Sequence, residues 1–191
     1  MLKHIPNLLC VARIFLVLPL LMLMLEGEYF WAFVIFAVAG ITDGLDGFLA
    51  RRFNWRSQLG AILDPIADKF LMVSVFLVLA ATDMVPVWLA LLVIGRDLLI
   101  VTGVVCYRTL IGPVAADASM VSKFNTLVQL VFVLAVLANA GTGVPRELWV
   151  TFLGAIVAAT TLVSGLDYVR EGIVRVWANN DSGLEGKGEA T

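Results

Sequence analysis

The stretch DGLDGFLARRFNWRSQLGAILDPIAD, residues 43–68, lies between two strongly apolar runs and is rich in aspartate. Its first two aspartates are three residues apart and its last two are four apart, and these spacings place each pair on one face of a helix. The joint between the pairs, residues 51–59, is short enough for an antiparallel helix pair. We therefore expect the two acidic faces to meet. They carry Asp43, Asp46, Asp64 and Asp68.

The chain around this stretch has the composition of a membrane protein. Apolar residues make up 61% of its 191 residues and charged residues 15%, against roughly 25% charged residues in an average soluble domain. An apolar run of about 18 residues is needed to cross a hydrocarbon core about 30 Å thick. The sequence therefore predicts an all-α polytopic membrane protein with six transmembrane helices and a short N-terminal interfacial segment. The expected spans are 8–25, 30–49, 59–81, 86–107, 121–140 and 148–168.

The distribution of basic residues predicts how these spans are oriented. If the spans alternate in direction, one side of the membrane receives most of the lysines and arginines, and the opposite joints carry Arg146. Because cytoplasmic loops hold the excess of positive charge, we expect both termini and the acidic stretch to face the cytoplasm. The basic residues on that side are Lys3, Arg51, Arg52, Arg56, Arg108, Arg170, Arg175 and Lys187.

The two ends of the chain differ from the apolar spans. Lys3 precedes the first run without a small-residue cleavage site before Glu26, which indicates an uncleaved membrane helix rather than a signal peptide. Residues 179–191 are Gly-rich and polar, so we expect a membrane domain over 1–178 and a disordered polar tail after it. The net charge of -2, with no separate Lys/Arg-rich block, argues against a nucleic-acid partner. We expect an integral protein of the bacterial inner (cell) membrane.

Four carboxylates in one place require compensation by cations, since like charges at short range raise each other's pKa. Hard oxygen ligands favour Mg²⁺ or Mn²⁺, and four of them suit two ions. Gly47, Ala50 and Gly60 lie among the acids and have little or no side chain, which permits a ligand to approach closely. Two divalent cations suit displacement at phosphorus, and the planar donors of Arg51 suit a phosphate oxygen. These residues predict phosphoryl or phosphodiester transfer at the membrane surface.

Other interpretations of the same acids are open. Carboxylates at helix ends also occur at membrane interfaces without further function, and intramembrane acids also line ion or proton pathways. An ion-conducting protein would spread its acids through several spans at bilayer depth, whereas these acids cluster on one side of two adjacent spans. A non-catalytic assembly protein would keep its role after losing the metals.

Written out, the stretch reads Asp43-x-x-Asp46-Gly47-x-x-Ala50-Arg51, eight further residues, and then Gly60-x-x-x-Asp64-x-x-x-Asp68. This resembles the signature of the CDP-alcohol phosphatidyltransferase family at every fixed position. The resemblance extends over about residues 5–175 and includes the six spans. It implies a homodimeric two-metal enzyme that transfers a phosphatidyl group from CDP-diacylglycerol to an alcohol and releases CMP.

The resemblance also implies a role for each motif residue. The metal ligands would be Asp43, Asp46, Asp64 and Asp68. Asp68 would also be the catalytic base, because an alcohol is a weak nucleophile at neutral pH and needs a carboxylate within reach of its proton. The donor-binding residues would be Asn7, Asp46, Gly47, Ala50, Arg51 and Gly60.

The acceptor alcohol depends on residues outside the motif. The opening segment IPNLLCVAR resembles the branch of the family that forms phosphatidylglycerol phosphate or cardiolipin. Its Arg13 is expected near a lipid phosphate, with a snorkelling arginine as the alternative. Arg96 and Asp97 are costly inside an apolar span, which predicts either an ion pair with another span or a place in the acceptor pocket. Lys123 suits an anionic acceptor, with interface anchoring as the alternative.

Val104 favours one acceptor over the other. Phosphatidylglycerol phosphate-forming members of the family resemble this chain but usually carry an arginine at the position of Val104, eight residues after the one matching Arg96. The phosphate monoester of glycerol 3-phosphate is dianionic and would require that extra cation. Phosphatidylglycerol has a singly charged phosphodiester, for which Arg96 and Lys123 suffice. We therefore expect phosphatidylglycerol as the acceptor, with glycerol 3-phosphate as the alternative.

Overall fold

The computed structural model describes the backbone of residues 5–53, 58–110 and 120–188, and the side chains of residues 15–42, 44, 68–103, 120–170 and 172. Within these ranges the protein has six α-helices and no β-strand, and each expected span lies within or overlaps one helix. The all-α prediction is therefore confirmed. The helices are α1 (Ile5–Leu25), α2 (Tyr29–Phe53), α3 (Gln58–Ala81), α4 (Val87–Leu110), α5 (Met120–Thr142) and α6 (Glu147–Gly188).

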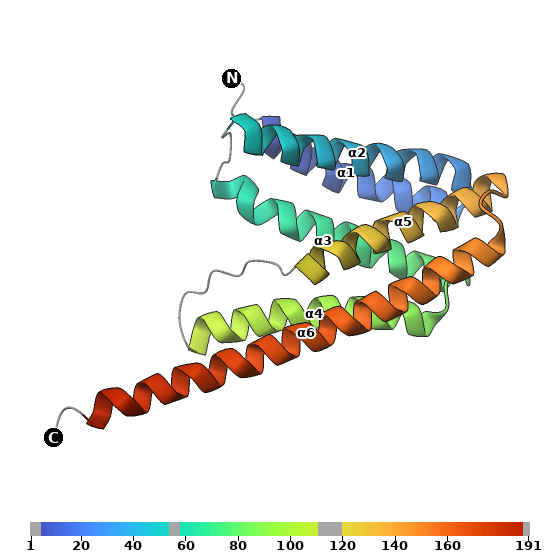
Figure 1. Cartoon of the computed structure of the whole chain (residues 1–191). Coiled ribbons are helices and arrows are strands. Elements are labelled where there is room, and N and C mark those ends of the chain that lie inside the picture. Colours follow the sequence, from blue (N-terminus) through green and yellow to red (C-terminus); the bar gives the residue numbers. More distant parts are fainter. Residues whose placement is uncertain (1–4, 54–57, 111–119, 189–191) are drawn as a thin grey trace.

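The helices form a closed ring in which each one packs against two others. Around the ring, α1 is followed by α2, α5, α6, α4 and α3, and α3 packs again on α1. Helices α1, α3 and α5 run in one direction and α2, α4 and α6 in the other, so the two termini lie at the same end of the bundle (Figure 1). We call this end the termini end. The opposite end, where short connections join α1 to α2, α3 to α4 and α5 to α6, is called the turn end.

Apolar side chains from all six helices fill the inside of the ring. The rings of Phe76 on α3 and Phe132 on α5 stack with their centroids 6.3 Å apart. Close packing of this kind gains dispersion energy whether water or lipid surrounds the bundle. The core residues that are at most 3% exposed include Leu20, Met24, Phe36, Val75, Phe76, Val93, Phe132, Val133 and Val157.

Short turns close the turn end at the joints that the sequence predicts. In the first, Gly27 has a φ of 81° and the amide of Glu28 donates to the carbonyl of Leu23 at 2.8 Å. This is a Schellman ending, in which a left-handed residue lets the chain reverse after the helix. Asp83 (φ 56°) and Gly143 (φ 75°) take the same left-handed conformation after α3 and α5. The predicted breaks between these spans are confirmed.

The outward surface of the bundle is apolar over much of its length. Among the described side chains, two helical segments are long and apolar enough to cross a membrane, Met120–Thr142 and Glu147–Arg170. A soluble monomer rarely exposes so much contiguous apolar surface. The six-span arrangement stays a prediction. Large apolar side chains that are more than half exposed include Phe15, Leu18, Met22, Leu91, Leu98, Leu127, Phe152, Leu162 and Leu166.

The C-terminal segment differs from the sequence prediction. Helix α6 continues to Gly188, so residues 179–188 are helical where we expected a disordered polar tail. Extending a helix that already exists adds one hydrogen bond per residue without a new nucleus, which allows a polar segment to continue an apolar helix. Figure 1 shows the end of α6 projecting beyond the other helices. The domain boundary at residue 178 stays a prediction.

Helices α2 and α5 approach each other closely at Gly141. A β-carbon at this position would lie 2.6 Å from the backbone nitrogen of Phe30 and 2.7 Å from its Cα. Phe30 belongs to the first turn of α2, so the clash would be with helical backbone rather than with the end of a flexible side chain. The contact therefore requires glycine at position 141.

We predict that Gly141→Ala destabilises the protein by about 1–3 kcal/mol, because α2 and α5 must move apart. The measurement is the thermal unfolding midpoint in detergent. Gly95→Ala is the matched control, since a β-carbon at Gly95 meets nothing within 4 Å and alanine favours the helix by about 1 kcal/mol. Equal midpoints for the two variants would contradict the close approach.

Candidate active site

The aspartates of the acidic stretch lie on two consecutive helices. Asp43 and Asp46 are in the second half of α2, and Asp64 and Asp68 are in the first half of α3. The helices are joined by residues 54–57, and a chain segment spans at most about 3.5 Å per residue, so the end of α2 and the start of α3 stay close. The predicted helical setting of both acid pairs is confirmed.

Most of the predicted site residues lie outside the residues whose side chains the structure describes. Their placement on helices is known from the backbone, with Asn7 and Arg13 on α1, and their roles stay predictions. The residues concerned are Asn7, Arg13, Asp43, Asp46, Gly47, Ala50, Arg51, Gly60 and Asp64.

Asp68, the expected base, is described and is half-buried on α3. The next residue, Lys69, forms an ion pair with Asp97 of α4, with 2.6 Å between Nζ and Oδ2. This contact ties the turn of α3 that carries Asp68 to the middle of α4.

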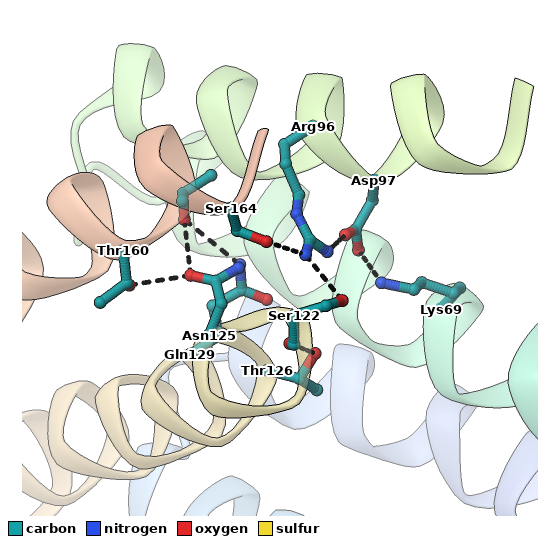
Figure 2. Close-up of polar contacts among 10 residues, drawn as sticks. Lys69, Arg96, Asp97, Ser122, Asn125, Thr126, Gln129, Thr160 and Ser164 are labelled. Carbon is teal, nitrogen blue, oxygen red and sulfur yellow. Dashed lines mark hydrogen bonds and ion pairs between the residues drawn. The ribbon is translucent and has the colours of Figure 1, made fainter. Parts of the chain in front are cut away.

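Asp97 also pairs with its neighbour Arg96, whose Nη1 donates to Oδ1 of Asp97 at 2.8 Å. The other terminal nitrogen of Arg96 donates to the hydroxyl of Ser122 on α5 at 2.8 Å and to the hydroxyl of Ser164 on α6. Arg96 and Asp97 are 5% and 4% exposed. Figure 2 shows the resulting polar network, in which side chains of α3, α4, α5 and α6 converge. The predicted ion pair with another span is confirmed through Lys69, and the acceptor role of Arg96 stays a prediction.

The network lies well inside the bundle. Ser122 is in the first turn of α5, whereas Lys69 lies about 11 residues after the start of α3 and Arg96 about 14 residues before the end of α4. At 1.5 Å per residue, α3 and α4 therefore extend roughly 15–20 Å beyond the level of the network towards the termini end. Figure 1 shows α5 starting between helices that continue past it.

A second polar layer lies one helical turn further along α5. The Oδ1 atom of Asn125 accepts hydrogen bonds from the hydroxyls of Thr160 at 2.8 Å and Thr161 at 3.1 Å, and the amide of Gln129 donates to Thr161 at 3.4 Å. Asn125, Gln129 and Thr161 are at most 1% exposed. Interhelical hydrogen bonds of this kind contribute about 0.6–2 kcal/mol each in membrane proteins. They fix how α5 is rotated and shifted against α6.

Two buried donors in these layers have no hydrogen-bond partner among the described residues, Nε of Arg96 and Nδ2 of Asn125. A buried polar group without a partner costs about 1–3 kcal/mol.

The sequence prediction included Arg96 and Lys123 but missed most of the network. Lys123 is exposed, whereas Asn125 and Gln129 of the same helix are buried. The signal for the buried face is in the sequence: Ser122, Asn125 and Gln129 are polar, and their spacing of three and four residues places them on one side of an apolar helix. Lys69 carried a signal as well, because it is a charge inside the expected apolar span 59–81, but its partner Asp97 could not be predicted from spacing.

Divalent cations are the expected cofactors, and the available ligands suit them. Among the side chains that the structure describes, no three His, Cys, Asp or Glu residues come together, and Asp68 is the one expected ligand in that set. Within each pair the two aspartates lie about one helical turn apart, one pair on α2 and the other on α3. Carboxylate oxygens are the ligands that Mg²⁺ and Mn²⁺ prefer. The chemistry of these ligands fits divalent cations, and the two-metal site stays a prediction.

Comparison with known proteins agrees with the motif. Residues 3–165 match the model of the CDP-alcohol phosphatidyltransferase family. The chain is 38% identical to a human cardiolipin synthase (CMP-forming), covering 88% of this chain and 61% of that protein. It is 33% identical to a cardiolipin synthase (CMP-forming) of Streptomyces coelicolor, covering 80% and 71%. It is 31% identical to the CDP-diacylglycerol–glycerol-3-phosphate 3-phosphatidyltransferase of Bacillus subtilis, covering 86% and 93%.

The family match covers most of the chain and coincides with the acidic motif on α2 and α3. The chain belongs to the CDP-alcohol phosphatidyltransferase family. It spans about three-fifths of the length of the human relative, and its relatives include proteins named for two different acceptors. The family resemblance predicted from the sequence is confirmed.

We predict that Asp97→Asn destabilises the protein by about 3–5 kcal/mol, because it leaves the buried charge of Arg96 without its carboxylate. The measurement is the shift in thermal unfolding midpoint in detergent. Asp83→Asn is the control, since Asp83 is exposed in a turn and asparagine tolerates its positive φ. Equal shifts for the two variants would show that the Asp97 ion pairs contribute nothing to stability.

Proposed function

We propose that the protein is a cardiolipin-forming enzyme that transfers a phosphatidyl group from CDP-diacylglycerol to phosphatidylglycerol and releases CMP. The hydroxyl oxygen of phosphatidylglycerol forms a bond to the phosphorus that carries diacylglycerol. The pyrophosphate bond to CMP breaks, and the hydroxyl proton passes to a carboxylate. The observation that carries this proposal is the 38% identity, over 88% of the chain, to a protein named cardiolipin synthase (CMP-forming).

The motif residues divide this work. Asp68 takes the proton of the acceptor hydroxyl, and its half-buried place on α3 supports this role. Arg51 neutralises charge on the pyrophosphate, while Asn7, Gly47, Ala50 and Gly60 border the donor nucleotide. Asp43, Asp46, Asp64 and Asp68 would hold two Mg²⁺ or Mn²⁺ ions, which supply charge neutralisation at the phosphorus and the leaving phosphate when bound.

The charge balance of the polar network supports an acceptor with a single negative charge. Asp97 compensates one of the two cations that it contacts, which leaves one net positive charge on Lys69, Arg96 and Asp97 together. A phosphodiester carries one negative charge and matches this balance. Arg13 and Lys123 are further proposed contacts of the acceptor lipid, and Val104 offers no cation for a second charge.

The exposed tryptophans support a position across the membrane. Trp31, Trp88 and Trp149 lie in the first turns of α2, α4 and α6 and are 56–61% exposed. These helices start at the turn end, and tryptophan is enriched where a membrane meets water. We propose that the turn end lies at the outer interface of the bacterial inner membrane, with six spans and the termini end in the cytoplasm. A homodimer is proposed from the family resemblance.

A second candidate is the transfer of phosphatidyl to glycerol 3-phosphate. It is favoured by the Bacillus subtilis relative, because 93% of that protein aligns with this chain. The two proposed reactions use the same donor and metals and release the same product, CMP. They differ in the acceptor alcohol alone.

An acceptor assay distinguishes the candidates. The purified protein is given labelled CDP-diacylglycerol and Mg²⁺ or Mn²⁺, with phosphatidylglycerol, glycerol 3-phosphate or inositol offered separately, and CMP and lipid products are measured. We expect CMP release with phosphatidylglycerol. Turnover with glycerol 3-phosphate alone would favour the second candidate, and no CMP with any acceptor would support an ion-conducting or non-catalytic protein.

We predict that Asp64→Asn lowers CMP release at least 100-fold, on the order of the loss expected when a group that stabilises charge in the transition state is removed. The unfolding midpoint should be retained, which shows that the variant is folded. Asp167→Asn is the control, because Asp167 lies on α6 outside the acidic motif. Retained activity in Asp64→Asn would remove this residue from the metal site.

A further inference from the structure

The two cations that share Asp97 are held in different ways. Arg96 is buried and donates to Asp97, Ser122 and Ser164, so its terminal nitrogens are already engaged. Lys69 contacts Asp97 through its ammonium, and its side chain is 33% exposed against 4% for Arg96. The ammonium has three N–H donors on a flexible stem, whereas the guanidinium is planar and fixed by its partners. Lys69 is therefore the cation of this pair that can reach a ligand.

Lys69 also has a favourable position relative to the proposed chemistry. It follows Asp68 directly on α3, and its ammonium lies 2.6 Å from Oδ2 of Asp97 on α4. The first turn of α5 lies at the same level, because Ser122 accepts a hydrogen bond from Arg96. The start of a helix favours a negative charge.

We infer that Lys69, rather than Arg96, is the residue that binds the phosphodiester of the acceptor lipid, and that Asp97 and Arg96 are positioning residues that hold its ammonium between α3 and α4. This inference rests on the proposed function. Asp97 stays paired with Arg96 when Lys69 turns towards the lipid, so its buried carboxylate keeps a cation throughout. Arg96 keeps its hydrogen bonds to Ser122 on α5 and Ser164 on α6, and these hold the Arg96–Asp97 pair in place when Lys69 moves.

The inference differs from the prediction made from the sequence, which assigned the acceptor or lipid phosphate to Arg13, Arg96 and Lys123. Lys123 is exposed on α5, and among the described residues no hydrogen bond or ion pair joins it to the network. Lys69 and Lys123 are therefore alternative candidates for binding the acceptor phosphate. Replacing each with methionine shows which of them contributes to binding.

The test measures binding without turnover. Dihexanoyl-phosphatidylglycerol, which is soluble, is titrated into the detergent-purified full-length protein by calorimetry, and neutral dihexanoylglycerol is the uncharged probe. We expect Lys69→Met to weaken binding of dihexanoyl-phosphatidylglycerol about tenfold, the size of effect for one charge-assisted contact, and to leave dihexanoylglycerol binding unchanged. Lys69→Arg should restore most of the affinity. Arg146→Met, a charge removed at the turn end, is the matched control and should have no effect.

The outcomes are distinct. A tenfold loss in Lys123→Met with none in Lys69→Met would overturn the inference in favour of the sequence prediction. Equal weakening of both probes by Lys69→Met would show a general loss of structure and would also overturn it. In the acceptor assay, Lys69→Met should raise the KM for phosphatidylglycerol with little change in the KM for CDP-diacylglycerol. If wild-type protein binds phosphatidylglycerol through Lys69 but releases no CMP, the proposed function fails while the binding role of Lys69 stands.

Discussion

The buried carboxylate of Asp97 is the constraint on which the middle of this bundle depends. Removing an ion from water costs several kcal/mol, and the cost is offset when the charge is paired and fully hydrogen-bonded. Asp97 meets this condition with one cation from its own helix and one from α3. Arg96 in turn needs the hydroxyls of Ser122 and Ser164 to satisfy its remaining donors. Four helices are therefore fixed relative to one another by a requirement of charge compensation.

The network around Asp97 divides the bundle into an apolar half towards the turn end and the half that carries the proposed site. Towards the turn end the ring is filled by side chains such as Phe36, Phe76 and Phe132, and its helices are joined by short turns. At the level of Asp97 the filling becomes polar, and α5 has its first turn. Helices α3 and α4 continue towards the termini end, where the chain also carries most of its basic residues.

The sequence predicted the helices and the turns because both are local properties. Apolar runs define where each helix lies, and Gly27 and Asp83 allow the left-handed conformations that end α1 and α3. The family and its donor followed from the motif on residues 43–68, whose spacing is also local. The partners of the Arg96–Asp97 pair were not predicted fully. Lys69, which pairs with Asp97, and Ser164, which accepts from Arg96, are far from the pair in the sequence and meet it through the order of helices in the ring. The extension of α6 to Gly188 was not predicted. The disordered tail was inferred from the polar composition of residues 179–191, and composition alone does not take into account the helix that precedes them.

The central claim is that phosphatidyl moves from a CDP-linked donor to an intact phosphatidylglycerol. Its most direct measurement uses CDP-diacylglycerol and phosphatidylglycerol with acyl chains of different mass, followed by mass spectrometry of the lipid product and quantification of CMP. The account predicts cardiolipin that contains one phosphatidyl group from each substrate, with one CMP released per molecule formed. Cardiolipin built from two phosphatidylglycerol molecules with release of glycerol, or product formed without CMP, would contradict it.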